Sequence, residues 1–76
     1  MYTLDRLEPE MEATVVSNHA SGSVRRRIME MGILPGVRLE MVRRAPLGDP
    51  LEVVVKGYHL SLRMSEARCI EVEVLE

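Results

Sequence analysis

The side chains best suited to chemistry in this sequence are two histidines and a lone cysteine, His19, His59 and Cys69. Imidazole nitrogens and thiolate sulfur bind transition metals, and a histidine can also exchange a proton near neutral pH. Metal sites are usually signalled by closely spaced ligand pairs, and these three residues are far apart in the chain. They are therefore weak candidate metal ligands, and we expect no cofactor to be required.

Catalysis would need more than these three groups. A reactive cysteine needs a positive neighbour or a base, and Cys69 has only Arg68 beside it at the start of an expected strand. A phosphate-binding loop needs a glycine-rich run, whereas Gly32 and Gly36 are placed to end a helix and to form a turn. The sequence therefore predicts a protein that is not an enzyme.

Positive charge is concentrated in one stretch of an otherwise acidic chain of net charge −2. Residues 25–44 contain only two acidic residues, Glu30 and Glu40. The same stretch contains the arginines Arg25, Arg26, Arg27, Arg38, Arg43 and Arg44. Such a dipolar distribution can orient a protein on a charged partner.

The arginine triplet Arg25, Arg26 and Arg27 has two simple interpretations. It could contact phosphates, but a solvated helix face is the more common role of such a run. Small barrels that bind single-stranded nucleic acids stack the bases on aromatic side chains, and Tyr2 and Tyr58 are the only aromatic residues. We expect no nucleic-acid binding and assign the triplet to steering towards an acidic protein partner.

A proline-stiffened loop is the second candidate contact. Residues 45–50 read Ala-Pro-Leu-Gly-Asp-Pro, so Leu47 lies between Pro46 and Pro50. A leucine exposed on a rigid loop loses little entropy on docking. A leucine folded inward would instead complete the core, and the residues alone leave both interpretations open.

The length, the single cysteine and the absence of long apolar runs limit the number of domains and the cellular compartment that we expect. A chain of 76 residues is expected to form one domain over residues 1–76, and one cysteine excludes an internal disulfide. Charged residues such as Asp5, Arg6 and Glu8 interrupt the start, so we expect no signal peptide. No apolar run approaches the ~20 residues of a membrane span. We expect a cytoplasmic protein without membrane insertion, and leave its oligomeric state open.

Alternating apolar residues predict five strands, at 12–17, 37–44, 51–55, 58–62 and 70–74. A short helix is expected from Ser21 or Ser23 to Met31, with Val24, Ile28 and Met31 in one apolar stripe that forms its buried face. Single helical turns are expected at 3–7 and 65–67. Gly32 should end the helix, while Pro35-Gly36 and Lys56-Gly57 should form tight turns.

The core should be aliphatic and rich in methionine. We expect it to be filled in part by Met29, Met31, Met41 and Met64. Closing five short strands into a barrel removes edges that so few residues cannot cover. The predicted fold class is therefore mainly β, a small barrel with one short helix.

Three motifs, in this order, resemble the FeoA family. The first motif has two parts, Leu4 with Leu-Glu-Pro at 7–9, followed by the helix end at 31–36, which reads Met-Gly-Ile-Leu-Pro-Gly. The loop at 44–50 and the closing segment at 62–72 are similar to the corresponding parts of that family, so the resemblance covers essentially the whole chain. The family often has glycine after the first proline, where this chain has Glu10, so the entry into the first strand can differ.

The resemblance implies an SH3-like barrel that works beside FeoB, the membrane protein that takes up ferrous iron and carries a cytosolic GTP-binding domain. It favours docking through Pro46, Leu47 and Pro50 over an inward leucine. Whether docking changes GTP turnover stays open. The alternatives are a transition-metal-binding regulatory domain and, less favoured, a nucleic-acid-binding barrel like the domain at the end of metal-dependent repressors.

Overall fold

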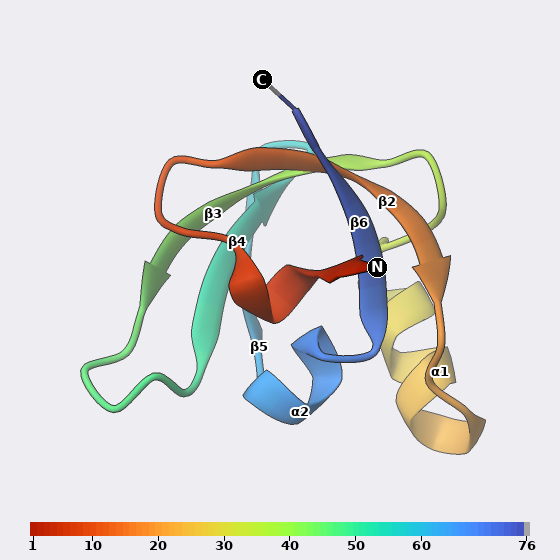
Figure 1. Ribbon diagram of the computed structural model, residues 1–76. Helices are drawn as coiled ribbons and strands as arrows, with labels where there is room; N and C mark the ends of the chain where they lie inside the picture. The colour runs from red at the N-terminus through yellow and green to blue at the C-terminus, as the bar shows by residue number, and fades with distance from the viewer. Residues whose placement is uncertain (76) are drawn as a thin grey trace.

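Six antiparallel strands form one curled sheet in the computed structural model, which describes residues 1–75 (Figure 1). The strands are β1 (Tyr2–Thr3), β2 (Glu12–Asn18), β3 (Arg38–Arg44), β4 (Leu51–Val55), β5 (Tyr58–Leu62) and β6 (Ile70–Leu75). The helices are η1 (Leu4–Arg6, a 3₁₀ turn), α1 (Gly22–Glu30) and α2 (Met64–Ala67). The strand order is β1-β6-β2-β3-β4-β5, so β1 and β5 are the two edges.

Two bulges bend the long strands of this sheet. The register of β2 with β6 shifts between Val15 and Ser17, and that of β3 with β4 shifts between Met41 and Arg43. A bulge adds one residue to one strand and increases its local bend and twist. The second shift explains why the alternation of β3 weakens at Val42.

The sixth strand, β1, is absent from the sequence prediction. Tyr2 pairs with Val72 and Thr3 with Glu71, and η1 follows at once. A strand of two residues is too short for an alternating pattern, so only its partner β6 could be predicted.

The core is aliphatic, as expected, with Met41 fully buried and Met31 and Met64 packed against its rim. The largest fully buried side chains are Leu4, Leu7, Val15, Ile28, Ile33, Leu39, Met41, Leu51, Val53, Leu62 and Ile70. The prediction for Met29 is wrong, since its side chain is 42% exposed.

Helix α1 contacts the core through a narrower stripe than predicted. Ile28 is fully buried and Met31 is half-buried, but Val24 remains 42% exposed, so the prediction of a buried Val24 is wrong. A helix of nine residues beside the barrel offers only its last turns to the core (Figure 1).

A glycine motif ends α1. Gly32, at φ +89°, donates its N–H to the carbonyl of Met29 at 3.0 Å, and Ile33 donates to the carbonyl of Ile28 at 3.3 Å. These two bonds define the Schellman motif, in which an apolar contact commonly joins the residues of the longer bond. Ile28 and Ile33 are both fully buried in the core, so the motif also directs the chain back to the barrel.

The two predicted tight turns are present. Val37 donates its N–H to the carbonyl of Leu34 at 3.0 Å across Pro35-Gly36, and Gly36 has φ +91°. Lys56 and Gly57 both have positive φ, and Val55 pairs with Tyr58 across them. These conformations are the type II and type I′ turns that favour glycine.

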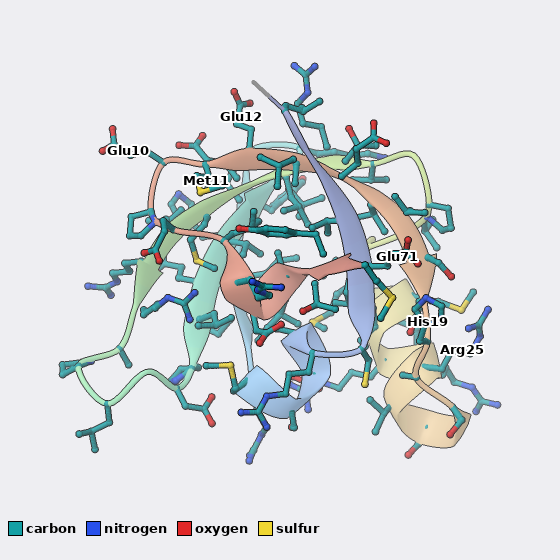
Figure 2. The ribbon with its side chains drawn as sticks, viewed as in Figure 1. Glu10, Met11, Glu12, His19, Arg25 and Glu71 are labelled. Atoms are coloured by element: carbon teal, nitrogen blue, oxygen red, sulfur yellow. The ribbon has the colours of Figure 1, made fainter. Side chains whose placement is uncertain are left out.

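A third turn of the same kind uses a glutamate. Met11 donates its N–H to the carbonyl of Glu8 at 3.0 Å across Pro9-Glu10, and Glu10 has φ +74°. Proline followed by a residue of positive φ is the type II pattern, in which glycine normally takes the second place. Figure 2 shows the side chain of Glu10 pointing away from the barrel. The chain thus enters β2 through a glycine-like conformation despite lacking the glycine.

We expect Glu10→Gly to raise the free energy of unfolding by up to about 1 kcal/mol, because it removes a strained left-handed residue at a small entropic cost. Gly36→Ala should lower it by about 1–2 kcal/mol, although a Cβ there would meet nothing within 4 Å. Urea titration followed by circular dichroism measures both. No gain in stability from Glu10→Gly, together with no loss from Gly36→Ala, would contradict this account of the two turns.

Candidate partner-binding surface

The β3–β4 loop, residues 45–50, is a closed turn rather than a flexible tether. Gly48 donates its N–H to the carbonyl of Ala45 at 2.7 Å, and Ala45 donates to the carbonyl of Pro50 at 3.0 Å. The carboxylate of Asp49 accepts the N–H of Met64 at 3.0 Å, which joins the loop to the start of α2. The loop is therefore held at its base and along one side.

Leu47 stands at the tip of this loop. Its side chain is 97% exposed, and Pro46 before it is exposed as well. The interpretation in which Leu47 folds into the core is therefore wrong. An apolar side chain on a preorganised loop can dock without a large ordering cost.

The arginine triplet of α1 does not act as one patch. The Nη1 of Arg25 donates to the carbonyl of Asn18, and the Nδ2 of Asn18 donates to the carbonyl of Arg25 at 3.3 Å. The Nε of Arg27 lies 3.2 Å from the Oε2 of Glu66. Within residues 1–75, only Arg26 of the three has no hydrogen bond or ion pair. Two of the three arginines thus serve the fold, which the sequence did not indicate.

Glu66 explains the position of Arg27. Its side chain is buried, and its Oε1 accepts the N–H of Arg63 at 2.9 Å. A buried carboxylate needs such partners because desolvation penalises an unpaired charge. The pair of Arg27 and Glu66 consequently fastens α1 to α2.

Four of the six predicted contact residues line two shallow hollows. One is lined by Arg27, Pro50 and the residues around Ser61, so it joins the base of the β3–β4 loop to α1. The other is lined by Arg25, Arg26, Met29 and Leu34. Figure 1 shows the loop, α2 and α1 along one end of the barrel. The loop and the arginine triplet thus lie at the same end of the barrel, but Pro46 and Leu47 line neither hollow.

Of the three candidate metal ligands, His19 and Cys69 line one hollow, whereas His59 lies apart from them. The Nε2 of His19 lies 2.8 Å from the Oε1 of Glu71 (Figure 2), and the N–H of His19 donates to the carbonyl of Cys69 at 2.8 Å. His59 is on β5 and pairs with Glu52 instead. In the part of the chain that the structure describes, no three histidine, cysteine or acidic side chains form a metal-binding group.

A cross-strand charge network lies on the outer face of β3, β4 and β5. The Nδ1 of His59 donates to the Oε2 of Glu52 at 2.6 Å, and the Nε of Arg43 donates to its Oε1 at 2.9 Å. The hydrogen bond from His59, followed by that from Arg43, lowers the pKa of the Glu52 carboxyl. Glu52 therefore stays ionised to lower pH than an isolated glutamate, as an ion-pair partner and not as a general acid.

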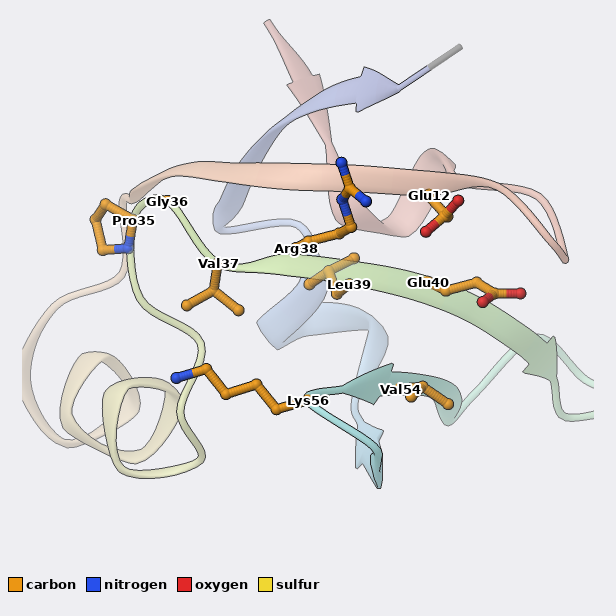
Figure 3. Close-up of a pocket in the computed structure, with 9 residues that line it drawn as sticks. All are labelled: Glu12, Pro35, Gly36, Val37, Arg38, Leu39, Glu40, Val54 and Lys56. Carbon is orange, nitrogen blue, oxygen red and sulfur yellow. The ribbon is translucent and has the colours of Figure 1, made fainter.

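Sequence reasoning did not anticipate the groove that Figure 3 shows across β2, β3 and β4. Its lining includes Pro35, Val37, Arg38, Glu40, Val54, Lys56 and Glu12. Glu12 and Glu40 are directly opposite each other in the sheet. The alternation of β3 was the available signal, because it places Arg38 and Glu40 on the outer face. The groove has charges of both signs and contains none of the predicted site residues.

The family follows from a sequence comparison over nearly the full chain. A family model described as the FeoA domain matches residues 2–74. The chain belongs to the FeoA family. FeoA is linked to ferrous iron transport, and the three motifs of the sequence fall within the matched range. The predicted family is thus confirmed.

The relatives of this FeoA chain agree on fold and setting. It is 38% identical over 72 residues to an Fe(2+) transport protein A/Fe(2+) transporter FeoB fusion protein of Porphyromonas gingivalis, covering 95% of this chain and 8% of that protein. Iron(II) transport protein A from Clostridium thermocellum has a TM-score of 0.93 at 38% identity, over 97% of this chain and 46% of that one. The chain therefore spans less than half the length of either relative.

A third relative is described as a protein with an SH3 domain. The zinc complex of FeoA from Stenotrophomonas maltophilia, described as a prokaryotic SH3 domain protein, has a TM-score of 0.83 at 35% identity, over 96% of this chain and 91% of that one. The predicted SH3-like barrel is confirmed, with six strands in place of five. Among residues 1–75, no helix has the length and apolar character needed to cross a membrane.

Proposed function

We propose that this FeoA chain is a non-catalytic accessory protein of ferrous iron uptake that binds a FeoB-like transporter at its cytosolic part. The observation that carries the proposal is the Porphyromonas gingivalis relative, whose name places transport protein A and FeoB in one polypeptide. Covalent linkage raises the effective concentration of two domains that act together. A separate FeoA chain must reach the same association through its own surface.

The β3–β4 loop is the favoured contact. Leu47 provides the exposed apolar group, and Pro46 and Pro50 limit the conformations of its flanks. The two hydrogen bonds within the loop and the bond from Asp49 to α2 keep it in place before binding. Binding energy is therefore not consumed in ordering the loop.

Charge steering falls mainly to Arg26. Arg25 and Arg27 are engaged within the chain, whereas Arg26 is exposed on α1 at the same end of the barrel. Rim charges mainly change the association rate, and their field is screened beyond about 8–10 Å at physiological salt.

Binding of the purified chain to a FeoB-like transporter in lipid nanodiscs tests the proposal. Arg26→Glu should slow association severalfold in low salt and less in high salt, with dissociation little changed. Lys56→Glu is the matched control, because Lys56 lies in the β4–β5 turn at the other end of the barrel. Equal effects of the two reversals would contradict steering through α1, and the absence of any binding would contradict the function.

A transition-metal-binding regulatory role is the second candidate, because the Stenotrophomonas maltophilia FeoA structure is a zinc complex. In this chain, His19 and Cys69 are the neighbouring candidate ligands, with Glu71 already bonded to His19. They provide at most a partial coordination shell. We therefore rank this role below partner binding.

A further inference from the structure

The two edges of the sheet differ in how well they are protected. The edge strand β1 has two residues, whereas the edge strand β5 has five, from Tyr58 to Leu62. An edge strand presents unpaired backbone N–H and C=O groups, which can pair with another strand. Very short strands avoid this, so β1 is protected by its length and β5 is not.

The unpaired groups of β5 belong to two residues. The turn at Lys56-Gly57 makes Val55 and Tyr58 a hydrogen-bonded pair, and pairs alternate along an antiparallel ladder. The backbone groups of His59 and Ser61 therefore point away from β4. Among the described residues, neither backbone makes a hydrogen bond outside the β4–β5 ladder.

The composition of β5 also lacks the usual protection of an edge. Natural edges carry proline, lysine or other charged side chains that prevent pairing. The strand reads Tyr-His-Leu-Ser-Leu, with no proline, lysine, arginine or acidic residue. Tyr58 is 74% exposed, and His59 and Ser61 are exposed as well. Nothing on this strand opposes the approach of a second strand.

We propose that two copies of this chain associate by antiparallel pairing of their β5 strands. The outward groups of His59 and Ser61 are separated by one residue, so a two-fold axis at Leu60 brings His59 opposite Ser61 of the second copy. Both such pairs can then exchange their N–H and C=O groups, which satisfies all the outward groups of the strand. The register is self-complementary, as a symmetric dimer requires.

The side chains fit the same register. Leu60 is half-buried at the edge, and pairing places it against Leu60 of the second copy. Tyr58 comes opposite Leu62 of the second copy, but the Leu62 side chain is fully buried in its own core, so this pair adds no side-chain contact. Arg63 falls opposite Gly57, and no like charges face each other across the axis. An edge contact of five residues a side buries less than the roughly 1,200 Å² of a stable complex. The dimer is therefore weak and reversible.

Sedimentation equilibrium over micromolar to millimolar protein tests this pairing. The wild-type average mass should rise with concentration from 8.6 kDa towards twice that value. Ser61→Pro should remain at the monomer mass, because it deletes an outward N–H and leaves the ladder to β4 intact. Ser61→Ala is the matched control that keeps the N–H, and it should follow the wild type.

Hydrogen exchange on the wild-type chain tests the same pairing without a variant, and so applies even if Ser61→Pro does not fold. The amides of His59 and Ser61 should become more protected as protein concentration rises, while other exposed amides stay unchanged. A monomer at every concentration would overturn the proposal, as would association that persists in folded Ser61→Pro. Protection that appears only with the transporter would assign the edge to that partner instead. The average mass and the amide protection are measured on the isolated chain, so a failure of the proposed transporter binding would not change either of them.

Discussion

Ile28→Ala is expected to lower the free energy of unfolding by about 2–5 kcal/mol. Ile28 is the fully buried side chain of α1, and its carbonyl accepts the longer bond of the Schellman motif. Alanine would leave a cavity between α1 and the barrel. The loss would be a large share of the 5–15 kcal/mol that stabilises a typical domain, and this one is small.

Val24→Ala is the matched control for this prediction. Val24 lies one turn earlier on α1 but is 42% exposed, so its truncation should change stability by about 0.5 kcal/mol or less. Urea unfolding followed by circular dichroism compares the two variants on one scale. Equal losses would show that α1 packs through the wider stripe that the sequence predicted.

Leu47→Asp is expected to weaken binding to the FeoB-like transporter by about 2 kcal/mol or more, roughly thirtyfold, chiefly through faster dissociation. The substitution puts a charge into an apolar contact from which water is excluded. Stability should be unchanged, because the Leu47 side chain is 97% exposed in the free chain. Binding kinetics by biolayer interferometry and thermal unfolding separate the two effects.

Tyr58→Asp is the control for surface hydrophobicity. Tyr58 is 74% exposed beside the β4–β5 turn, at the end of the barrel opposite the β3–β4 loop (Figure 1). It should leave the dissociation rate within a factor of about two. A larger effect of Tyr58→Asp than of Leu47→Asp would move the contact to the other end of the barrel.

The turns were predictable from sequence because glycine has a positional meaning. Gly32, Gly36 and Gly57 all have positive φ, as their places after a helix, after a proline and in a hairpin indicated. The turn at Pro9-Glu10 shows the limit of this reasoning. Glutamate adopts φ +74° there, because the bonds on either side of the turn hold it, and no local preference predicts that.

The packing of α1 was less predictable, because it depends on how the helix is tilted. Periodicity identified one apolar face with Val24, Ile28 and Met31, but only its C-terminal part, Ile28 and Met31, contacts the barrel. Met29 directly follows Ile28 and so lies outside this face, which leaves it at the surface. A short helix has more apolar residues than its contact with the core can bury.

The residues of the candidate surface could be proposed from the sequence, but the contacts that two of its arginines make within the chain could not. The residues left both an exposed and an inward Leu47 open, and the structure shows the exposed one. The ion pair of Arg27 with Glu66 joins residues 39 positions apart in the sequence. Such a pair leaves no local pattern. Glutamate side chains are usually exposed, so the burial of Glu66 could not be predicted from its residue type.

Photo-cross-linking tests the central claim most directly. A benzophenone side chain is introduced at Leu47 in one variant and at Tyr58 in another, and each is irradiated with the FeoB-like transporter in nanodiscs. The account predicts a cross-link from position 47 to the cytosolic part of the transporter, and little or none from position 58. Cross-linking from position 58 without any from position 47 would contradict docking through the β3–β4 loop.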